Sequence, residues 1–195
     1  GGSLRIIPVR ESISTTAILE KASAVFHPEN ERWKEVEKCV SKKIVPARES
    51  PALFLDRDGT INKEVLYLHE PENFSLLPGS ADGIRKFMDM GYKIVIITNQ
   101  PGIGMGYFRE EDFYRVNREM LKQLSEKGIL VDKIYFCPHS KAEKCSCRKP
   151  EQALIERAIT ELRLIPEASV FIGDKTSDLE AGKRAGMTTV LVETG

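Results

Sequence analysis

Four short polar segments of the sequence have the residue types of a site for a metal ion and a phosphate group. Asp56 and Asp58 stand two positions apart after an apolar run. Thr98-Asn99-Gln100 and Asp174-Lys175 follow two further apolar runs, and Arg148-Lys149 precedes a predicted helix. Carboxylates with few nitrogen ligands favour a hard cation such as Mg²⁺. Threonine, lysine and arginine beside that cation would share the charge of a phosphate group.

Each segment also has a purely structural explanation when it is taken alone. An Asp-x-Asp sequence after a strand is often a turn or a helix cap, and a lone lysine such as Lys149 is usually a solvated surface residue. Two carboxylates held side by side repel each other, however, and a cation or a shared proton is the usual remedy. All four segments are predicted to lie at the same edge of one sheet, which favours a functional site.

The apolar pattern from residue 51 onward predicts strands that alternate with helices. Continuous apolar runs are typical of parallel strands buried on both faces, and apolar residues three and four positions apart mark helices. The predicted strands are 52–55, 93–98, 133–137, 169–173 and 188–192; the predicted helices are 80–90 with Ser80 as its cap, one that ends at Gly128, one that Pro150 opens, and 177–185. This order predicts an α/β fold with a doubly wound, Rossmann-like parallel sheet, whose ligands bind at the carboxyl ends of its strands.

A cluster of cysteines and one histidine has the spacing of a metal site. Its members are Cys137, His139, Cys145 and Cys147. Three thiols and one imidazole compose a closed, tetrahedral structural zinc site with no open position for water. The alternative, a set of incidental cysteines, is disfavoured by the spacing. Residues 138–146 contain no large aliphatic side chain, so zinc would tie a loop that has little core of its own. Cys39 is predicted to be a buried or spare thiol.

The overall charge excludes some classes of partner. The chain has 195 residues, and 29 Lys and Arg residues balance 29 Asp and Glu residues. A net charge of zero argues against a protein that seeks nucleic acid or an anionic membrane. No apolar run approaches the roughly 20 residues that span a bilayer, and no signal segment follows the N-terminal Gly-Gly-Ser. The clustered cysteines, which are poorly spaced for disulfides, favour a reducing cytoplasm. We also expect a monomer with a small-molecule substrate and neither a nucleic-acid nor a membrane partner.

The polar segments resemble the four motifs of the haloacid dehalogenase superfamily. The matching residues are Phe54 to Thr60 (FLDRDGT), Ile97-Thr98-Asn99, Lys149, and Gly173 to Asp178 (GDKTSD), in that order. The resemblance spans residues 52 to about 192 and implies a sheet of the haloacid dehalogenase type. More narrowly, DRDGTIN from Asp56, TNQPGIGMGY from Thr98, Cys137-Pro138-His139 and CSCRKP from Cys145 resemble the bacterial heptose-1,7-bisphosphate 7-phosphatases. The histidinol-phosphate phosphatases are their close relatives.

This resemblance implies hydrolysis of a phosphomonoester through a covalent aspartyl phosphate. Asp56 would be the nucleophile, and Asp58 would protonate the leaving oxygen and then activate water. Mg²⁺ would be bound by the side chains of Asp56 and Asp174 and by the backbone carbonyl of Asp58. Thr98 and Lys149 would hold the transferring phosphoryl oxygens. The acid at position 58 also argues for phosphoryl transfer, because members of the superfamily that cleave carbon–halogen bonds need no acid there.

Selection of the substrate is expected to rest on short loops. The spacing between the motifs leaves no room for an inserted cap domain. The residues expected to contact substrate are Asn99, Gln100, Arg148 and Lys175, and the resemblance to the heptose family adds Glu64 and Tyr67. Asp178 is expected to orient Lys149 or a metal-bound water. Arg148 suits a second phosphate or carboxylate. Residues 64–67 read Glu-Val-Leu-Tyr where the heptose family usually reads Asp-x-Gly-Tyr, whereas the glycine-rich loop 102–106 favours a heptose over histidinol phosphate.

The first 50 residues lie outside the phosphatase resemblance, so we predict two units, 1–50 and 51–195. Ser14-Thr15-Thr16 is predicted to begin one helix, and Trp33, Val36 and Val40 mark a second. Two interpretations stay open. The segment is either a helical extension packed on the core or the remnant of a fused nucleotidyltransferase, because Ile13 to Ile18 resembles a helix start of cytidylyltransferase-like enzymes.

Together these features predict a Mg²⁺-dependent sugar phosphatase with a structural Zn²⁺. The favoured reaction is removal of the 7-phosphate of D-glycero-D-manno-heptose 1,7-bisphosphate in the synthesis of nucleotide-activated heptose. Two alternatives stay open: a histidinol-phosphate phosphatase and a catalytically inactive, zinc-containing binding module. The presence of both Asp56 and Asp58 disfavours the inactive module. The zinc loop is expected to position Arg148 and Lys149 over the pocket.

Overall fold

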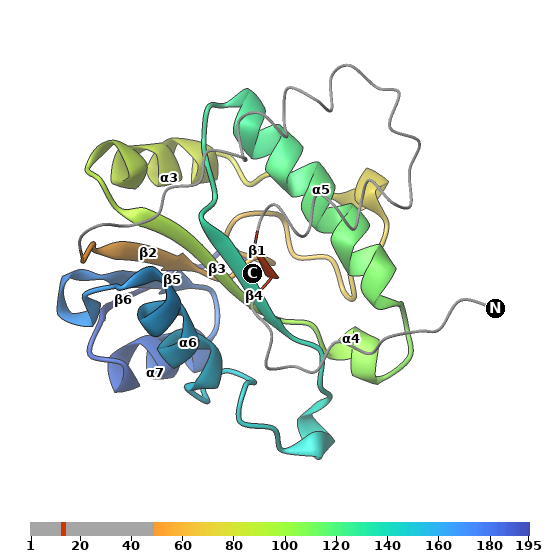
Figure 1. The fold of residues 1–195 in the computed structure, drawn as a ribbon. Coiled ribbons are helices and arrows are strands. Elements are labelled where there is room, and N and C mark those ends of the chain that lie inside the picture. The colour runs from red at the N-terminus through yellow and green to blue at the C-terminus, as the bar shows by residue number, and fades with distance from the viewer. Residues whose placement is uncertain (1–12, 15–48) are drawn as a thin grey trace.

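A single sheet organises the chain in the computed structural model, which describes residues 13–14 and 49–195 (Figure 1). Its strands are β1 (Ile13–Ser14), β2 (Ala52–Leu55), β3 (Lys93–Asn99), β4 (Lys133–Cys137), β5 (Val170–Gly173) and β6 (Thr188–Leu191). They are ordered β1-β4-β3-β2-β5-β6. The strands from β2 to β6 are parallel, and β1 pairs with β4 in the antiparallel sense. The predicted five-stranded parallel sheet is therefore confirmed, with β2 at its centre.

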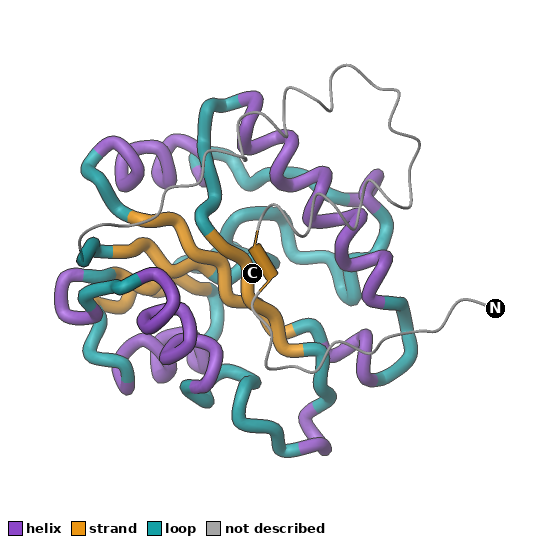
Figure 2. Tube along the Cα trace, in the orientation of Figure 1, coloured by secondary structure: helices purple, strands orange, loops and turns teal. Residues whose placement is uncertain are grey.

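Helices cover both faces of this sheet, as Figure 2 shows by the purple segments on either side of the orange strands. The α-helices are α3 (Ser80–Asp89), α4 (Pro101–Gly104), α5 (Glu110–Glu126), α6 (Ala153–Leu162) and α7 (Thr176–Arg184). Three short 3₁₀ helices are η1 (Pro71–Asn73), η2 (Lys141–Glu143) and η3 (Pro166–Ala168). Helices α3 and α5 pack on one face and α6 on the other, so the sheet is doubly wound.

Burial on both faces explains why the strands read as continuous apolar runs. Leu53 and Leu55 of β2 belong to the core under α3 and α5. Ala52 and Phe54, which alternate with them, belong to the core under α6. Successive side chains of a strand point to opposite faces, so a strand covered on both sides needs apolar residues at every position. Because the strands are apolar at every position, the polar residues that follow them are easily recognised in the sequence.

Three local predictions are corrected by the structure. Ser80 is the first residue of α3 and not its cap, because Gly79 takes the cap position with a left-handed φ of 81° that favours glycine. Pro150 lies in a turn before α6, which begins at Ala153. Ser14, predicted to begin a helix, ends strand β1. The helices predicted within residues 15–48 lie outside the described residues, and the division at residue 50 stays a prediction.

The segments between the polar motifs form the body of the fold. Between Asp56 and Thr98 the chain forms η1, α3 and most of β3, and between Thr98 and Lys149 it forms α4, α5, β4 and η2. The polar motifs are thereby carried to one edge of the sheet by elements that are themselves part of the core. Among the described residues, no helix is both long enough and apolar enough to cross a membrane.

Candidate functional site

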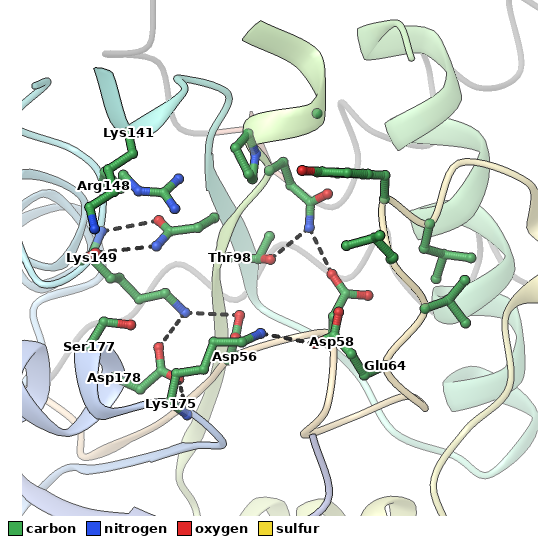
Figure 3. A pocket seen from close by; sticks show the side chains of 18 of the residues that line it. Asp56, Asp58, Glu64, Thr98, Lys141, Arg148, Lys149, Lys175, Ser177 and Asp178 are labelled. Carbon is green, nitrogen blue, oxygen red and sulfur yellow. Dashed lines mark hydrogen bonds and ion pairs between the residues drawn. The ribbon is translucent and has the colours of Figure 1, made fainter. Parts of the chain in front are cut away.

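The polar segments meet in one pocket of about 480 Å³ at the carboxyl ends of β2, β3 and β5 (Figure 3). Eleven of the predicted site residues line it: Asp56, Asp58, Glu64, Tyr67, Thr98, Asn99, Gln100, Arg148, Lys149, Lys175 and Asp178. Parallel strands present their carboxyl ends at the same edge of a sheet, which is why segments distant in sequence arrive at one place. Asp174 lies behind this lining, and its Oδ2 is 3.4 Å from Nζ of Lys175.

The centre of the pocket is a buried lysine held between two carboxylates. Nζ of Lys149 lies 2.9 Å from Oδ1 of Asp56 and 2.7 Å from Oδ1 of Asp178, and it donates a 2.6 Å hydrogen bond to the carbonyl of Ile97. Burial alone would lower the pKa of Lys149, but the two carboxylates outweigh burial and raise it above its usual value. The ammonium is therefore charged, and of the two partners expected for Asp178, Lys149 or a metal-bound water, the structure shows the ion pair with Lys149.

Asp56 is fixed by the sheet as well as by this lysine. Its backbone N–H donates to the carbonyl of Ile172 in β5 at 3.1 Å, which extends the pairing of β2 with β5 by one residue. Its Oδ1 also accepts a 2.8 Å hydrogen bond from the backbone N–H of Arg57. Only 4% of Asp56 is exposed. The carboxylate consequently has one oxygen anchored by two donors and a second oxygen, Oδ2, for other chemistry.

Asp58 is held by a buried arginine that sequence reasoning assigned no role. The side chain of Arg57 donates to both oxygens of Asp58 at 2.8 to 3.1 Å, and Arg57 is fully buried beside the ring of Phe113. Asn62 and Gln100 donate further hydrogen bonds to Asp58 at 3.0 and 2.9 Å. Burial would raise the pKa of Asp58, but Arg57 and these donors outweigh burial and keep it below its usual value.

Two amides predicted to contact substrate are engaged in positioning other site residues. Asn99 accepts from the backbone N–H of Lys149 at 3.1 Å and donates to its carbonyl at 3.3 Å. Gln100 donates through Nε2 to Asp58 and, at 2.8 Å, to Oγ1 of Thr98. Because Oγ1 of Thr98 accepts that bond, its hydroxyl hydrogen is available to donate into the pocket. Asn99 and Gln100 therefore fix Lys149, Asp58 and Thr98 in place.

A group of three carboxylates in the pocket has the chemistry of a divalent-cation site. Oxygens of Asp56, Asp174 and Asp178 lie within 4.8 Å of one another. Oδ1 of Asp174 is buried and has no hydrogen-bond partner. Burial and the neighbouring charges of Asp56 and Asp178 raise the pKa of Asp174 to about 6, despite the opposing charge of Lys175. Oxygen-only ligands, one of them without a donor, fit the preference of Mg²⁺.

The backbone conformation and the close packing at position 59 require a glycine there. It adopts a φ of 80°, in the left-handed region. A Cβ placed there would lie 2.5 Å from Oδ2 of Asp174. Any side chain at this position would therefore strain the backbone and displace a carboxylate of the candidate cation site.

The outer part of the pocket carries two cations on one side and an ion pair on the other. Lys141 of η2 and Arg148 lie together, on the side away from Asp58 and Glu64 (Figure 3). Nη1 of Arg148 donates to the carbonyl of His139 at 3.3 Å, so the cysteine-rich loop positions this guanidinium. Glu64 pairs with Nζ of Lys175 at 2.9 Å. Lys141 was missed from the sequence, because its place in the pocket depends on the path of that loop.

The four predicted zinc ligands converge. Sγ of Cys147 lies 3.2 Å from Sγ of both Cys137 and Cys145, and 3.3 Å from Nδ1 of His139. The four ligand atoms lie within 4.8 Å of one another. A hydrogen bond from Cys147 helps lower the pKa of Cys137 to about 7, whereas the hydrogen bond with Cys137 and burial raise the pKa of Cys147. Three sulfurs this close to an imidazole are a donor set that fits Zn²⁺.

We expect this cluster to bind Zn²⁺, and removal of the ion should lower activity without displacing the carboxylates. We expect kcat/KM to fall about 10- to 100-fold, because a displacement of ~1 Å in positioning groups such as Arg148 has effects of this order. The measurement is steady-state kinetics on protein treated with a chelator, freed of chelator and resupplied with Mg²⁺, with a zinc-reconstituted sample as control. Full activity in the zinc-free, Mg²⁺-supplied sample would refute this role of the loop.

Comparison with known proteins agrees with the fold and identifies the family. A family model described as HAD-hydrolase-like matches residues 146–195, the segment that contains Lys149, Asp174 and Asp178. The crystal structure of a D,D-heptose 1,7-bisphosphate phosphatase from B. bronchiseptica, in complex with magnesium and phosphate, superposes with a TM-score of 0.71. It is 30% identical and covers 74% of this chain and 82% of that one. Fold and site thus define a phosphatase of the haloacid dehalogenase type.

Sequence relatives define the family within that class. A D-glycero-β-D-manno-heptose-1,7-bisphosphate 7-phosphatase from Haemophilus influenzae is 43% identical over 151 residues, which cover 74% of this chain and 82% of the relative. A D-glycero-α-D-manno-heptose-1,7-bisphosphate 7-phosphatase from Photorhabdus laumondii is 42% identical over 150 residues, with 73% and 82% covered. The chain belongs to the heptose-1,7-bisphosphate 7-phosphatase family. The resemblance identified from the motifs is thereby confirmed.

Proposed function

We propose that the protein removes the 7-phosphate of D-glycero-D-manno-heptose 1,7-bisphosphate in a Mg²⁺-dependent reaction with an aspartyl-phosphate intermediate. The observation that carries the proposal is the buried Asp56 at the end of β2. It has Lys149 at 2.9 Å, and its carboxylate lies within 4.8 Å of those of Asp174 and Asp178. This arrangement places a nucleophile, a cation site and a fixed positive charge around one position. The named relatives support the sugar bisphosphate as substrate.

The side chains of Asp56 and Asp174, with the backbone carbonyl of Asp58, would hold the cation. When bound, Mg²⁺ supplies the positive charge that screens the repulsion between a carboxylate nucleophile and a phosphate dianion. The unpartnered Oδ1 of Asp174 supports this assignment. Asp178 pairs with Lys149 and so keeps the ammonium beside the phosphate position.

In the first half-reaction we assign Oδ2 of Asp56 as the attacking oxygen, because Oδ1 is anchored by Nζ of Lys149 and the backbone N–H of Arg57. A bond forms between this oxygen and phosphorus as the bond from phosphorus to the sugar oxygen breaks. Thr98 and Lys149 hold the transferring oxygens. Asp58 donates its proton to the departing sugar oxygen.

The lowered pKa of Asp58 fits this role once substrate is present. Arg57 keeps Asp58 ionised in the free protein, so Asp58 takes up a proton from solvent, or from the phosphate monoanion, as the substrate binds, and the negative charge of the phosphate favours the protonated form. After the sugar leaves, the ionised Asp58 takes a proton from water as the water oxygen attacks phosphorus. The bond between phosphorus and Asp56 then breaks and inorganic phosphate departs.

The two cations in the outer pocket support a substrate with a second phosphate. Lys141 and Arg148 would bind the phosphate at position 1 while position 7 faces Asp56. The same cations disfavour histidinol phosphate, because its amino group is positively charged. The relatives include enzymes named for both the α and the β anomer at nearly equal identity, so identity does not select between the anomers.

A substrate panel tests this proposal. It compares both anomers of the heptose bisphosphate with histidinol phosphate and with a hexose 6-phosphate, which lacks the second phosphate. We expect kcat/KM for one heptose bisphosphate anomer to exceed that of the hexose 6-phosphate at least about tenfold, the order of one charged hydrogen bond. A higher kcat/KM on histidinol phosphate than on either anomer would contradict the assignment.

A further inference from the structure

Two loops place exposed apolar side chains beside the pocket. Among the described residues, six large hydrophobic side chains are exposed: Leu66, Met90, Met105, Tyr107, Val190 and Leu191. Leu66, which is 79% exposed, belongs to the loop after β2. Met105 and Tyr107, 45% and 56% exposed, follow α4. These three, with Tyr67, are here called the apolar rim.

The two loops are locked against each other. The rings of Tyr67 and Tyr107 meet edge to face with centroids 4.6 Å apart, and the hydroxyl of Tyr67 lies 3.9 Å from the sulfur of Met105. A Cβ on Gly102 would lie 2.3 Å from the ring of Phe108 and 3.0 Å from that of Tyr67. Glycine at position 102 therefore lets the two loops close up. These contacts hold Tyr67, Tyr107 and Met105 of the apolar rim against one another.

The apolar rim is continuous with the site of phosphate chemistry. Leu66 and Tyr67 line the same pocket as Asp56 and Asp58, whereas Met105 and Tyr107 lie outside that lining and contact Tyr67. Lys141 and Arg148 also line that pocket, on the side away from Asp58 (Figure 3). A molecule that fills the pocket thus meets two anion-binding positions and an apolar surface. A sugar bisphosphate matches both kinds of surface, because its two phosphates are charged while the carbon–hydrogen faces of its ring are apolar.

We propose that the apolar rim determines substrate specificity: Leu66 and Tyr67 pack against the uncharged ring of the leaving group, and Met105 and Tyr107 hold Tyr67 in place for that contact. This inference rests on the proposed function and deepens it, because it names which part of the substrate the apolar rim binds. This contact removes apolar surface of both the protein and the sugar ring from water, which favours binding. The apolar rim therefore strengthens the binding of ring-containing phosphomonoesters and contributes nothing to short, open-chain ones.

The test compares two substrates on one double variant, Leu66→Ser with Met105→Ser. Steady-state kinetics is measured with the heptose bisphosphate and with glycerol 3-phosphate, which has no ring. We expect kcat/KM for the bisphosphate to fall about tenfold, mainly through KM, and that for glycerol 3-phosphate to change less than about twofold. The conservative variant Leu66→Met should retain the wild-type KM. Met90→Ser, at an exposed methionine just past the end of α3, is the matched control and should change neither substrate.

Several outcomes would overturn the inference. They are an unchanged KM for the bisphosphate, or equal losses on both substrates. A change in elution volume of the double variant with unchanged kinetics would also overturn it, because it would assign the apolar rim to contact between copies. Asp56→Asn is measured beside these variants. If Asp56→Asn still hydrolyses the substrate, the proposed function is refuted. The comparison of ring and open-chain substrates then tests the apolar rim independently.

Discussion

Asp56→Asn should abolish turnover, with kcat reduced about 10⁴-fold or more, as for the loss of other enzymatic nucleophiles. The neutral amide oxygen of asparagine is a poor nucleophile toward phosphorus. The substitution also removes one of the two carboxylates that flank Lys149, so the ammonium shifts toward Asp178. The fold should survive, because the change preserves volume and reduces the repulsion among three clustered carboxylates. Phosphate release from the heptose bisphosphate measures the effect.

Asp89→Asn is the matched control for this substitution. It makes the same chemical change at an exposed position at the end of α3, and it should leave kcat unchanged. Thermal unfolding of both variants separates loss of chemistry from loss of fold. Residual activity of Asp56→Asn above about one per cent of wild type, beyond what contamination explains, would place the nucleophile elsewhere.

The second large effect depends on the leaving group. Asp58→Asn should lower kcat about 10²- to 10⁴-fold on the sugar phosphate, the range for loss of a general acid and base. With p-nitrophenyl phosphate the first half-reaction should be much less affected, because nitrophenolate leaves without a proton. The release of nitrophenol in a rapid-mixing experiment measures that half-reaction directly.

The contacts of Asp58 with Arg57 require that its acid–base role be separated from a structural role. Asn at position 58 keeps the volume and one oxygen that can accept from Arg57, and thermal unfolding of the variant separates loss of acid–base chemistry from loss of local structure. Asp132→Asn is a control that removes another half-buried carboxylate. Asp132 pairs with Lys93 at the amino end of β3, opposite the end that carries the pocket. Equal losses of nitrophenol and sugar-phosphate turnover in the first half-reaction would mean that Asp58 acts only by holding the pocket together.

The architecture could be predicted from the sequence because it depends on patterns that are local. The continuous apolar runs indicated strands buried on both faces, and the helices between them required a parallel sheet. A parallel sheet places Asp56, Thr98 and Asp174 at one edge, so their approach followed from topology alone. The Cys137–Cys147 cluster could be predicted for the same reason, since its ligand spacing is local.

The partners of the amides and cations could not be predicted, because they depend on side-chain packing between distant segments. Asn99 and Gln100 were expected to contact substrate, yet Asn99 pairs with a backbone 50 residues away. Arg57 gave one signal, a charged residue directly after a buried strand, which requires a partner if it is buried. Lys141 gave none, because only the folded loop brings it to the pocket.

The most direct test of the account is to identify the covalent intermediate. Asp58→Asn is mixed with p-nitrophenyl phosphate and Mg²⁺, quenched with acid and mapped by peptide mass spectrometry. Without the base that activates water, the phosphorylated enzyme should accumulate, with a burst of nitrophenol and a phosphoryl group on the peptide that contains Asp56. Linear release of nitrophenol without a burst, or a phosphoryl group on a peptide lacking Asp56, would contradict the account.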